Sequence, residues 1–285
     1  MNQMPLALEK VMKQILIASV LINLALFAML SAGFITVSEA QMRWAGGVFL
    51  MLFVCTHGWY RYGLYRMVLF FCITLVVTWS LESLSIVTGF PFGQFVYSDK
   101  LGEKIGHVPI MIFPAYFFNG YLAWTTSQLF WGKQGTGITK KQLFLLPPTS
   151  ALLMVAWNAS FDPIMSTLQG YWTWQNGGAY FGVPLSNFAG WFVTVYLFFQ
   201  IFAFVLYRFS ADSPIAVGRY YWSLIPVMYG IQGLPYFLYP FFRSQDVTIY
   251  RSMALVTAMA MFLPAILSFV ASYTRDHRDQ WRQTD

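Results

Sequence analysis

Residues 67–87 read MVLFFCITLVVTWSLESLSIV, and this stretch decides the fold. The only charged side chain in it is that of Glu82. A helix needs about 20 predominantly apolar residues to cross the hydrocarbon core of a bilayer, and this run has that length. A helix is the structure expected here, because backbone groups find no hydrogen-bond partners in lipid. The stretch therefore predicts a membrane-spanning helix with one acidic residue near its end.

Apolar runs of similar length continue on both sides of this stretch. The eight predicted spans are Ile15–Phe34, Ala45–Tyr60, Met67–Val87, His107–Trp131, Phe144–Ser160, Ser186–Tyr207, Tyr220–Tyr239 and Ser252–Tyr273. Hydrophobic residues make up 58% of the chain and charged residues 10%, and the mean hydropathy is +0.55. This composition excludes an ordinary soluble domain, and no run alternates as a barrel strand would. We therefore predict an all-α, polytopic transmembrane bundle of about eight helices, forming a single integral membrane domain over residues 1–285.

The positions of the basic residues predict the orientation of this bundle. With eight spans, twelve of the 17 Lys and Arg residues fall on the side that holds both termini. Connections rich in Lys and Arg face the cytoplasm in most membrane proteins. We therefore expect both termini in the cytoplasm and the protein in the cytoplasmic membrane. The net charge of +6 adds some attraction to anionic lipid headgroups, whereas no motif indicates nucleic acid as a partner.

One face of the third predicted span collects its polar side chains. Its members lie at i, i+4, i+8 and i+11, which places them on one side of a helix. They are Thr74, Thr78, Glu82 and Ser85. An ionisable residue inside a membrane is costly and marks a functional site by default. We expect this face to point into the bundle.

A second acid, Asp162, follows the fifth predicted span. Asn158 stands one helical turn before it, so the two side chains should face the same way. Pro163 disfavours helical backbone at Asp162, which predicts that the helix ends there. Asn187 opens the sixth span and His107 opens the fourth, on the same outer side as both acids. The sequence thus predicts one polar cluster at the outer end of the bundle.

Two outer connections, residues 85–100 and 163–184, are rich in Gly, Pro and aromatic side chains. They could form an apolar lid above the polar cluster. The alternative is an ordinary interfacial belt, because Trp and Tyr are enriched at any membrane surface. Both acids lie at the same end as these connections, which favours the lid.

Several chemistries are excluded by the residues that the chain lacks. His57, His107 and His277 stand far apart in the sequence, so the histidine cluster of a membrane di-iron enzyme cannot be built. Every lysine lies outside the spans or at their edges, which removes a retinal Schiff base. There is no GxGxxG nucleotide fingerprint and no paired DxxD motif. What remains is acid and base catalysis by carboxylates, with water, on an apolar substrate, and no cofactor or metal is expected.

Several short motifs resemble a known family in their order along the chain. They are Glu82, GFPFGQFVY (89–97), GHVP (106–109), FDP (161–163), GYWTW (170–174) and YFGVPLSNFAGW (180–191). The chain resembles the carotenoid biosynthesis membrane family, which contains bacterial carotenoid hydratases and the archaeal bisanhydrobacterioruberin hydratase. The resemblance covers just over a third of the chain. It implies addition of water across the terminal isopropylidene double bond of an acyclic carotenoid, giving a tertiary alcohol.

The resemblance also implies roles for individual residues. A carboxyl group in a low-dielectric site can stay protonated near neutral pH, which suits Glu82 as proton donor and Asp162 as the ionised partner, although the two roles could be reversed. Asn158, Asn187 and His107 would hold the water. The expected substrate-binding residues are Phe92, Tyr97, Trp172, Trp174, Tyr180 and Trp191.

One position departs from the family pattern. Relatives often have Asp where this chain has Asn158, four residues before the Asp of the Asp-Pro pair. A site with fewer carboxylates could serve a carotenoid-binding or isomerising protein instead of a hydratase. A small-molecule transporter is a further alternative, although the chain has no inverted repeat or matched pair of interrupted helices.

Overall fold

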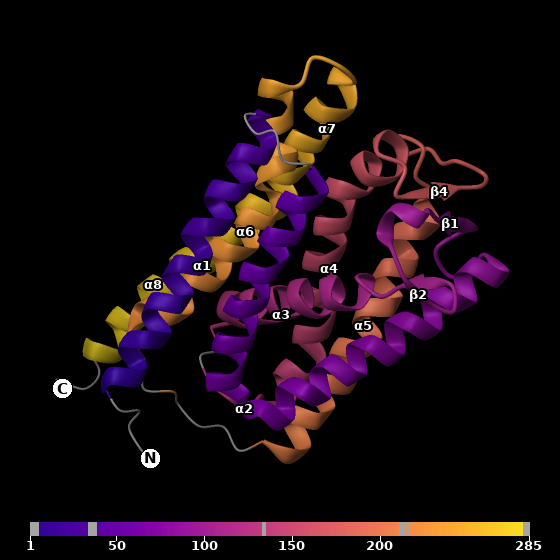
Figure 1. The fold of residues 1–285 in the computed structure, drawn as a ribbon. Coiled ribbons are helices and arrows are strands. Elements are labelled where there is room, and N and C mark those ends of the chain that lie inside the picture. The colour runs from indigo at the N-terminus through magenta and orange to yellow at the C-terminus, as the bar shows by residue number, and fades with distance from the viewer. Residues whose placement is uncertain (1–5, 34–38, 133–134, 211–214, 216, 282–285) are drawn as a thin grey trace.

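The computed structural model describes residues 6–33, 39–132, 135–210, 215 and 217–281, and it is a bundle of helices (Figure 1). The helices are α1 (Leu6–Ala32), α2 (Glu39–Thr88), α3 (Ile112–Phe130), α4 (Lys140–Asp162), α5 (Leu185–Phe209), α6 (Arg219–Phe242), α7 (Val247–Thr257) and α8 (Leu263–Trp281). A π-helical turn, Pro163–Leu168, extends α4, and a second, Ala258–Phe262, joins α7 to α8. The predicted helical bundle is confirmed.

Most of each predicted span lies in a helix, but not every helix has the length and apolar composition needed to cross a membrane. Five helical stretches of the described residues are long and apolar enough: Ala7–Ala32, Gln41–Thr88, Lys140–Leu168, Leu185–Phe209 and Val247–Tyr273. Helices α3 and α6 are not among them, and much of each is buried in the bundle. The chain is therefore a multi-pass membrane protein. The number of crossings and the side of the termini stay predictions.

Helix α2 contains the second and third predicted spans in one continuous element with a kink. At Gly63 the backbone takes φ 76° and ψ 165°, which is not helical, and the helix resumes in a new direction. Figure 1 shows the two limbs, residues 39–62 and 64–88, diverging from this point with α3 between them. A loop was expected between two separate helices. A single glycine achieves the turn instead, because only glycine readily adopts this backbone conformation.

We expect Gly63→Ala to destabilise the protein. A side chain at this φ and ψ costs about 1 to 3 kcal/mol, so the melting temperature of the purified protein in detergent should fall. The matched control is Gly47→Ala on the same helix, where an added Cβ meets no atom within 4 Å; it should leave stability equal or slightly higher. Equal melting temperatures for the two variants would refute the role of Gly63.

The two aromatic outer connections pair with each other. Strand β1 (Phe95–Tyr97) runs antiparallel to β4 (Trp172–Trp174), with Phe95 opposite Trp174 and Tyr97 opposite Trp172. In both strands the middle residue is exposed and the outer two are buried. The ring centroids of Phe95 and Trp174 lie 5.0 Å apart. A two-stranded ribbon is marginal alone, so this ring packing against the bundle holds it in place.

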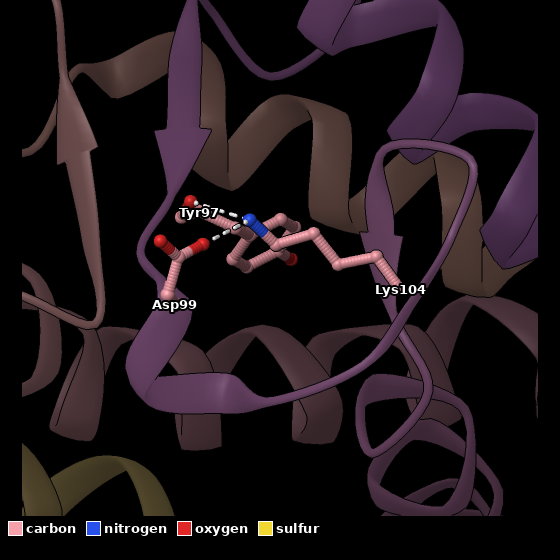
Figure 2. A network of polar contacts seen from close by, with 3 residues as sticks. All are labelled: Tyr97, Asp99 and Lys104. Carbon is pink, nitrogen blue, oxygen red and sulfur yellow. Dashed lines mark hydrogen bonds and ion pairs between the residues drawn. The ribbon is translucent and has the colours of Figure 1, made fainter.

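A short hairpin follows β1 and leads into α3. It consists of β2 (Lys104–Ile105) and β3 (Val108–Pro109), and a single 3-10 turn, Asp99–Leu101, joins it to β1. Lys104 Nζ donates hydrogen bonds to the backbone oxygen of Tyr97 and to Asp99 Oδ1, both at 3.1 Å, as Figure 2 shows. The hairpin is therefore tied to the end of β1, where the Tyr97 side chain enters the bundle.

Candidate active site

Glu82 lies in the second limb of α2 and is 3% exposed. Two phenols bind its carboxyl group: Tyr97 Oη donates to Oε2 and Tyr116 Oη donates to Oε1, both at 2.8 Å. Tyr97 comes from β1 and Tyr116 from α3, so three separate elements meet at this carboxyl. Thr74, Thr78 and Ser85 are buried as well, which confirms that this face of α2 points inward.

Asp162 is held by three nitrogen donors at the end of α4. Asn187 Nδ2 donates to Asp162 Oδ2 at 2.7 Å, and Asn158 Nδ2 donates to the same oxygen at 3.0 Å. Trp172 Nε1 donates to Oδ1 at 3.0 Å. Asn158 Oδ1 in turn accepts a hydrogen bond from Asn187 at 3.1 Å. The expected pairing of Asn158 with Asp162 is confirmed, and Asn187 joins the same network.

The sequence predicts that the helix ends at Asp162, and α4 does end there, but the backbone does not leave helical geometry. Asp162 has helical angles, φ −57° and ψ −46°, and the chain continues through the π-helical turn Pro163–Leu168. Proline disfavours a helical residue before it but does not forbid one. Here the Ser166 hydroxyl donates to the Asp162 backbone oxygen at 2.7 Å and supports the turn. Asp162 therefore lies where α4 meets this π-helical turn, and Asn187 holds its side chain.

The two carboxyl groups differ in what their partners can do. A tyrosine hydroxyl can donate or accept a hydrogen bond, whereas an asparagine NH₂ and an indole N–H can only donate. The surroundings of Glu82 can therefore satisfy both a neutral and an ionised carboxyl group. Both carboxyl oxygens of Asp162 already accept hydrogen bonds from N–H groups. None of these N–H groups could accept a hydrogen bond from a protonated carboxyl, so they favour the ionised form of Asp162.

The strand pair β1–β4 connects the two carboxyl groups. Tyr97, which binds Glu82, stands directly opposite Trp172, which binds Asp162, and their ring centroids are 6.1 Å apart. Burial, and next the charge of Glu82, raise the pKa of Tyr97 well above its ordinary value. The phenol thus keeps its proton, and one small sheet delivers a donor to each acid.

The turn after α2 is anchored by close contact with α5. Ser85 Oγ accepts from the Phe92 backbone N–H at 3.1 Å, and Ser186 Oγ donates to the Phe92 oxygen at 3.0 Å. A Cβ at Gly190 would lie 2.9 Å from the Phe92 Cα. The glycine lets α5 approach this turn, which explains why the FPFG and NFAGW motifs lie together in space.

Both acids line one cavity of about 1140 Å³. Its polar end contains Glu82, Tyr97, Tyr116, Asp162 and Asn187. Aromatic side chains surround this end: Phe92, Phe95, Phe161, Trp172, Trp174 and Trp191. Within the described residues, no three His, Cys, Asp or Glu side chains lie together as a metal site would need.

Trp174 lines the cavity and carries a buried donor without a partner among the described residues. It is 9% exposed, and its Nε1 has no hydrogen-bond partner in the described part of the chain. An indole N–H that lacks a protein partner can bind an oxygen atom of a ligand or of water.

Three of the predicted site residues do not line the cavity. His107 is exposed in the turn between β2 and β3, before α3 begins at Ile112, and it does not line the cavity. Tyr180 donates to the Ala159 backbone oxygen at 3.0 Å and does not line the cavity either. Burial, and next the charge of Asp162, raise the pKa of Tyr180 to about 12. Asn158 is buried and does not line the cavity, but it binds Asp162 and Asn187, which do.

Tyr116 is a residue of the candidate site that the sequence did not single out. Its ring stacks on Trp191, with the centroids 4.5 Å apart and the planes 10° from parallel. This places its hydroxyl on Glu82, which lies on another helix. No spacing within one helix could indicate the contact. The only available signal was a tyrosine in an apolar span, whose hydroxyl needs a partner when buried.

The chain is similar to known proteins of carotenoid biosynthesis. A family model described as "Carotenoid biosynthesis protein" matches residues 42–232, a range that includes both acids and all their partners. Bisanhydrobacterioruberin hydratase of Haloarcula japonica is 29% identical over 119 residues, which are 41% of this chain and 38% of the hydratase. The chain thus aligns with less than half of that relative's length. No solved structure matches the chain.

Proposed function

Because the chain belongs to the carotenoid biosynthesis protein family, we propose that it is a carotenoid hydratase of the cytoplasmic membrane. It adds water to the terminal isopropylidene double bond of an acyclic carotenoid and needs no cofactor. The observation that carries this proposal is a pair of buried carboxyl groups, Glu82 and Asp162, on one largely apolar cavity, with partners suited to different protonation states. The similarity to a protein named as a hydratase supports it.

The first step is protonation of the double bond. Glu82, in its neutral form, transfers its proton to the CH carbon, and the π electron pair forms the new C–H bond. The dimethyl carbon becomes a tertiary cation and Glu82 becomes a carboxylate. Tyr97 and Tyr116 then donate to both of its oxygens, as they do in the structure. Hydrogen bonds to a charged acceptor are about twice as strong as neutral ones, which stabilises the acid as it ionises.

The second step is capture of the cation by water. The water oxygen forms the C–O bond with the tertiary carbon, and Asp162 accepts one of its protons. The product is a tertiary alcohol, and the proton that Asp162 gained balances the one that Glu82 lost. Its transfer back to Glu82 through water restores the enzyme. General acid and base steps of this kind typically contribute 10²- to 10⁴-fold to a rate.

The aromatic side chains of the polar end have two roles in this proposal. Their apolar surface receives the hydrocarbon end group, and their π faces stabilise the cation by about 0.5 to 2 kcal/mol each. Asn158 and Asn187 keep Asp162 oriented.

Expression in a bacterium that accumulates lycopene tests the proposal. The expected result is a pigment heavier than lycopene by one water, or by two if both ends react. An isomerase would yield pigments of unchanged mass, because protonation would be followed by loss of another proton. A protein that only binds carotenoids would leave lycopene unaltered. Either result would overturn the hydratase proposal.

Asn158 provides a test of how Asp162 is held. We expect Asn158→Leu to lower turnover about tenfold to hundredfold, because a buried polar group that loses its partner costs about 1 to 3 kcal/mol. Asn158→Asp should instead move the pH profile of turnover, since two carboxyl groups one turn apart share a proton. Turnover by Asn158→Leu equal to that of the parent at every pH would show that the residue only packs.

A further inference from the structure

We propose that the apolar part of the cavity is a groove for the polyene chain of the substrate, open sideways to the lipid, so that one end group reacts per binding event. This inference rests on the proposed function and adds the binding mode. It follows from the residues that line the cavity beyond the two acids.

The first wall of the groove is a stripe along the first limb of α2. The lining side chains lie at i, i+4, i+7, i+11 and i+15, which is one face of a helix. They are Trp44, Val48, Met51, Cys55 and Trp59, with Gly47 beside them. At 1.5 Å per residue, this stripe is about 22 Å long. The cavity therefore extends as an elongated channel and is not confined to the acids.

The second wall comes from the other limb of α2 and from α3. Its residues are Leu64, Met67, Val68, Phe71, Phe117 and Phe118. The kink at Gly63 separates the two walls, and Figure 1 shows the limbs diverging from it.

The groove is open to the surroundings along its length. Leu64 is 67% exposed, Trp59 is 55% exposed and Val68 is 51% exposed, although all three line the cavity. Large apolar side chains so exposed on membrane-spanning helices face the hydrocarbon of the bilayer. A hydrophobic molecule dissolved in the lipid can thus enter sideways without crossing water.

The chemistry of the groove selects a rigid apolar rod. Beyond the acid end, the polar side chains among the described lining residues are Arg43, Thr56, Asn119, Gln232 and the hydroxyl-bearing Tyr236. Arg43 Nη2 donates to Tyr239 Oη at 2.9 Å. A conjugated polyene is straight and loses little conformational freedom on binding, which favours it over a flexible acyl chain. Because the groove joins the acid end, a polyene lying in it presents its end group to Glu82 and Asp162.

This arrangement has a consequence for a substrate with two identical ends. When one end group lies at the acids, the other end lies outside the acid site, toward the lipid. The molecule must leave and turn round before its second end can react. Singly hydrated product should therefore appear first and be released.

Filling the groove tests the proposal. In Gly47→Trp the new side chain enters open space, because a Cβ at Gly47 meets no atom within 4 Å. Met51→Trp enlarges a second position of the stripe. The matched control is Leu52→Trp, on the same limb and exposed but not on the cavity. With lycopene in lipid nanodiscs, the first two should lose at least about tenfold in turnover, and the control should stay within about twofold.

Two results would overturn the groove. The first is turnover by both Gly47→Trp and Met51→Trp equal to that of Leu52→Trp, with all three proteins folded to the same melting temperature. The second is doubly hydrated pigment that forms in the parent without a lag behind the singly hydrated one. Failure of the hydratase proposal itself is distinct, because the parent protein would then produce no hydrated pigment at all.

Discussion

Glu82→Gln should abolish hydration, with turnover of lycopene about 10³-fold below the parent. Glutamine has the shape of glutamic acid and can still accept a hydrogen bond from one of Tyr97 and Tyr116 while donating to the other. It has no proton to transfer to an alkene. The variant should therefore fold as the parent does but fail to protonate the double bond. Pigment analysis of membranes with equal amounts of parent and variant protein measures this.

The matched control is Glu103→Gln, the same change at an exposed acid in the outer connection before β2. It should hydrate lycopene at the rate of the parent, because Glu103 is exposed and does not line the cavity. If Glu82→Gln retained more than about a tenth of parental turnover, Glu82 would not be the proton donor.

Asp162→Asn should lower turnover by about 10² to 10³, the loss typical when a group that stabilises charge in the transition state is removed. The variant can no longer take a proton from water or face the cation with a negative charge. Its new NH₂ group must also point at one of the three donors that now bind Asp162. We therefore expect a lower melting temperature as well, which Glu82→Gln should not show.

Asp99→Asn is the control for this second variant. Asp99 is fully exposed, and its ion pair with Lys104 lies at the surface (Figure 2). Exposed ion pairs of this kind contribute little to stability because water screens them, so turnover and stability should change little. Turnover by Asp162→Asn equal to that of Asp99→Asn would remove Asp162 from the mechanism, and Glu82 would have to act with water alone.

Much of the fold could be predicted from the sequence, because lipid restricts the choice of structure. A run such as residues 67–87 can only be helical in a membrane. The spacing of its polar residues identified the buried face of the helix, which carries Glu82. The kink at Gly63 could not be predicted. A glycine between two apolar runs fits a loop as well as a kink, and the choice depends on α3 packing between the limbs.

The site was predictable where its members share a helix or a motif. Asn158 and Asp162 are one turn apart, and Asn187 lies in the YFGVPLSNFAGW motif (180–191) on which the predicted family resemblance rests. Tyr116 was missed and His107 was misplaced, because both positions depend on contacts between elements. The three-residue strands β1 and β4 are too short for sequence periodicity to reveal. They nevertheless decide which donor reaches which acid.

The source of the added oxygen tests the central claim most directly. The purified protein in lipid nanodiscs is incubated with lycopene in water labelled with heavy oxygen, under air and without any added cofactor. The account predicts a tertiary alcohol whose oxygen carries the label, formed by the parent and absent with Glu82→Gln. An alcohol whose oxygen comes from air, or the absence of any hydrated product from the folded parent, would contradict it.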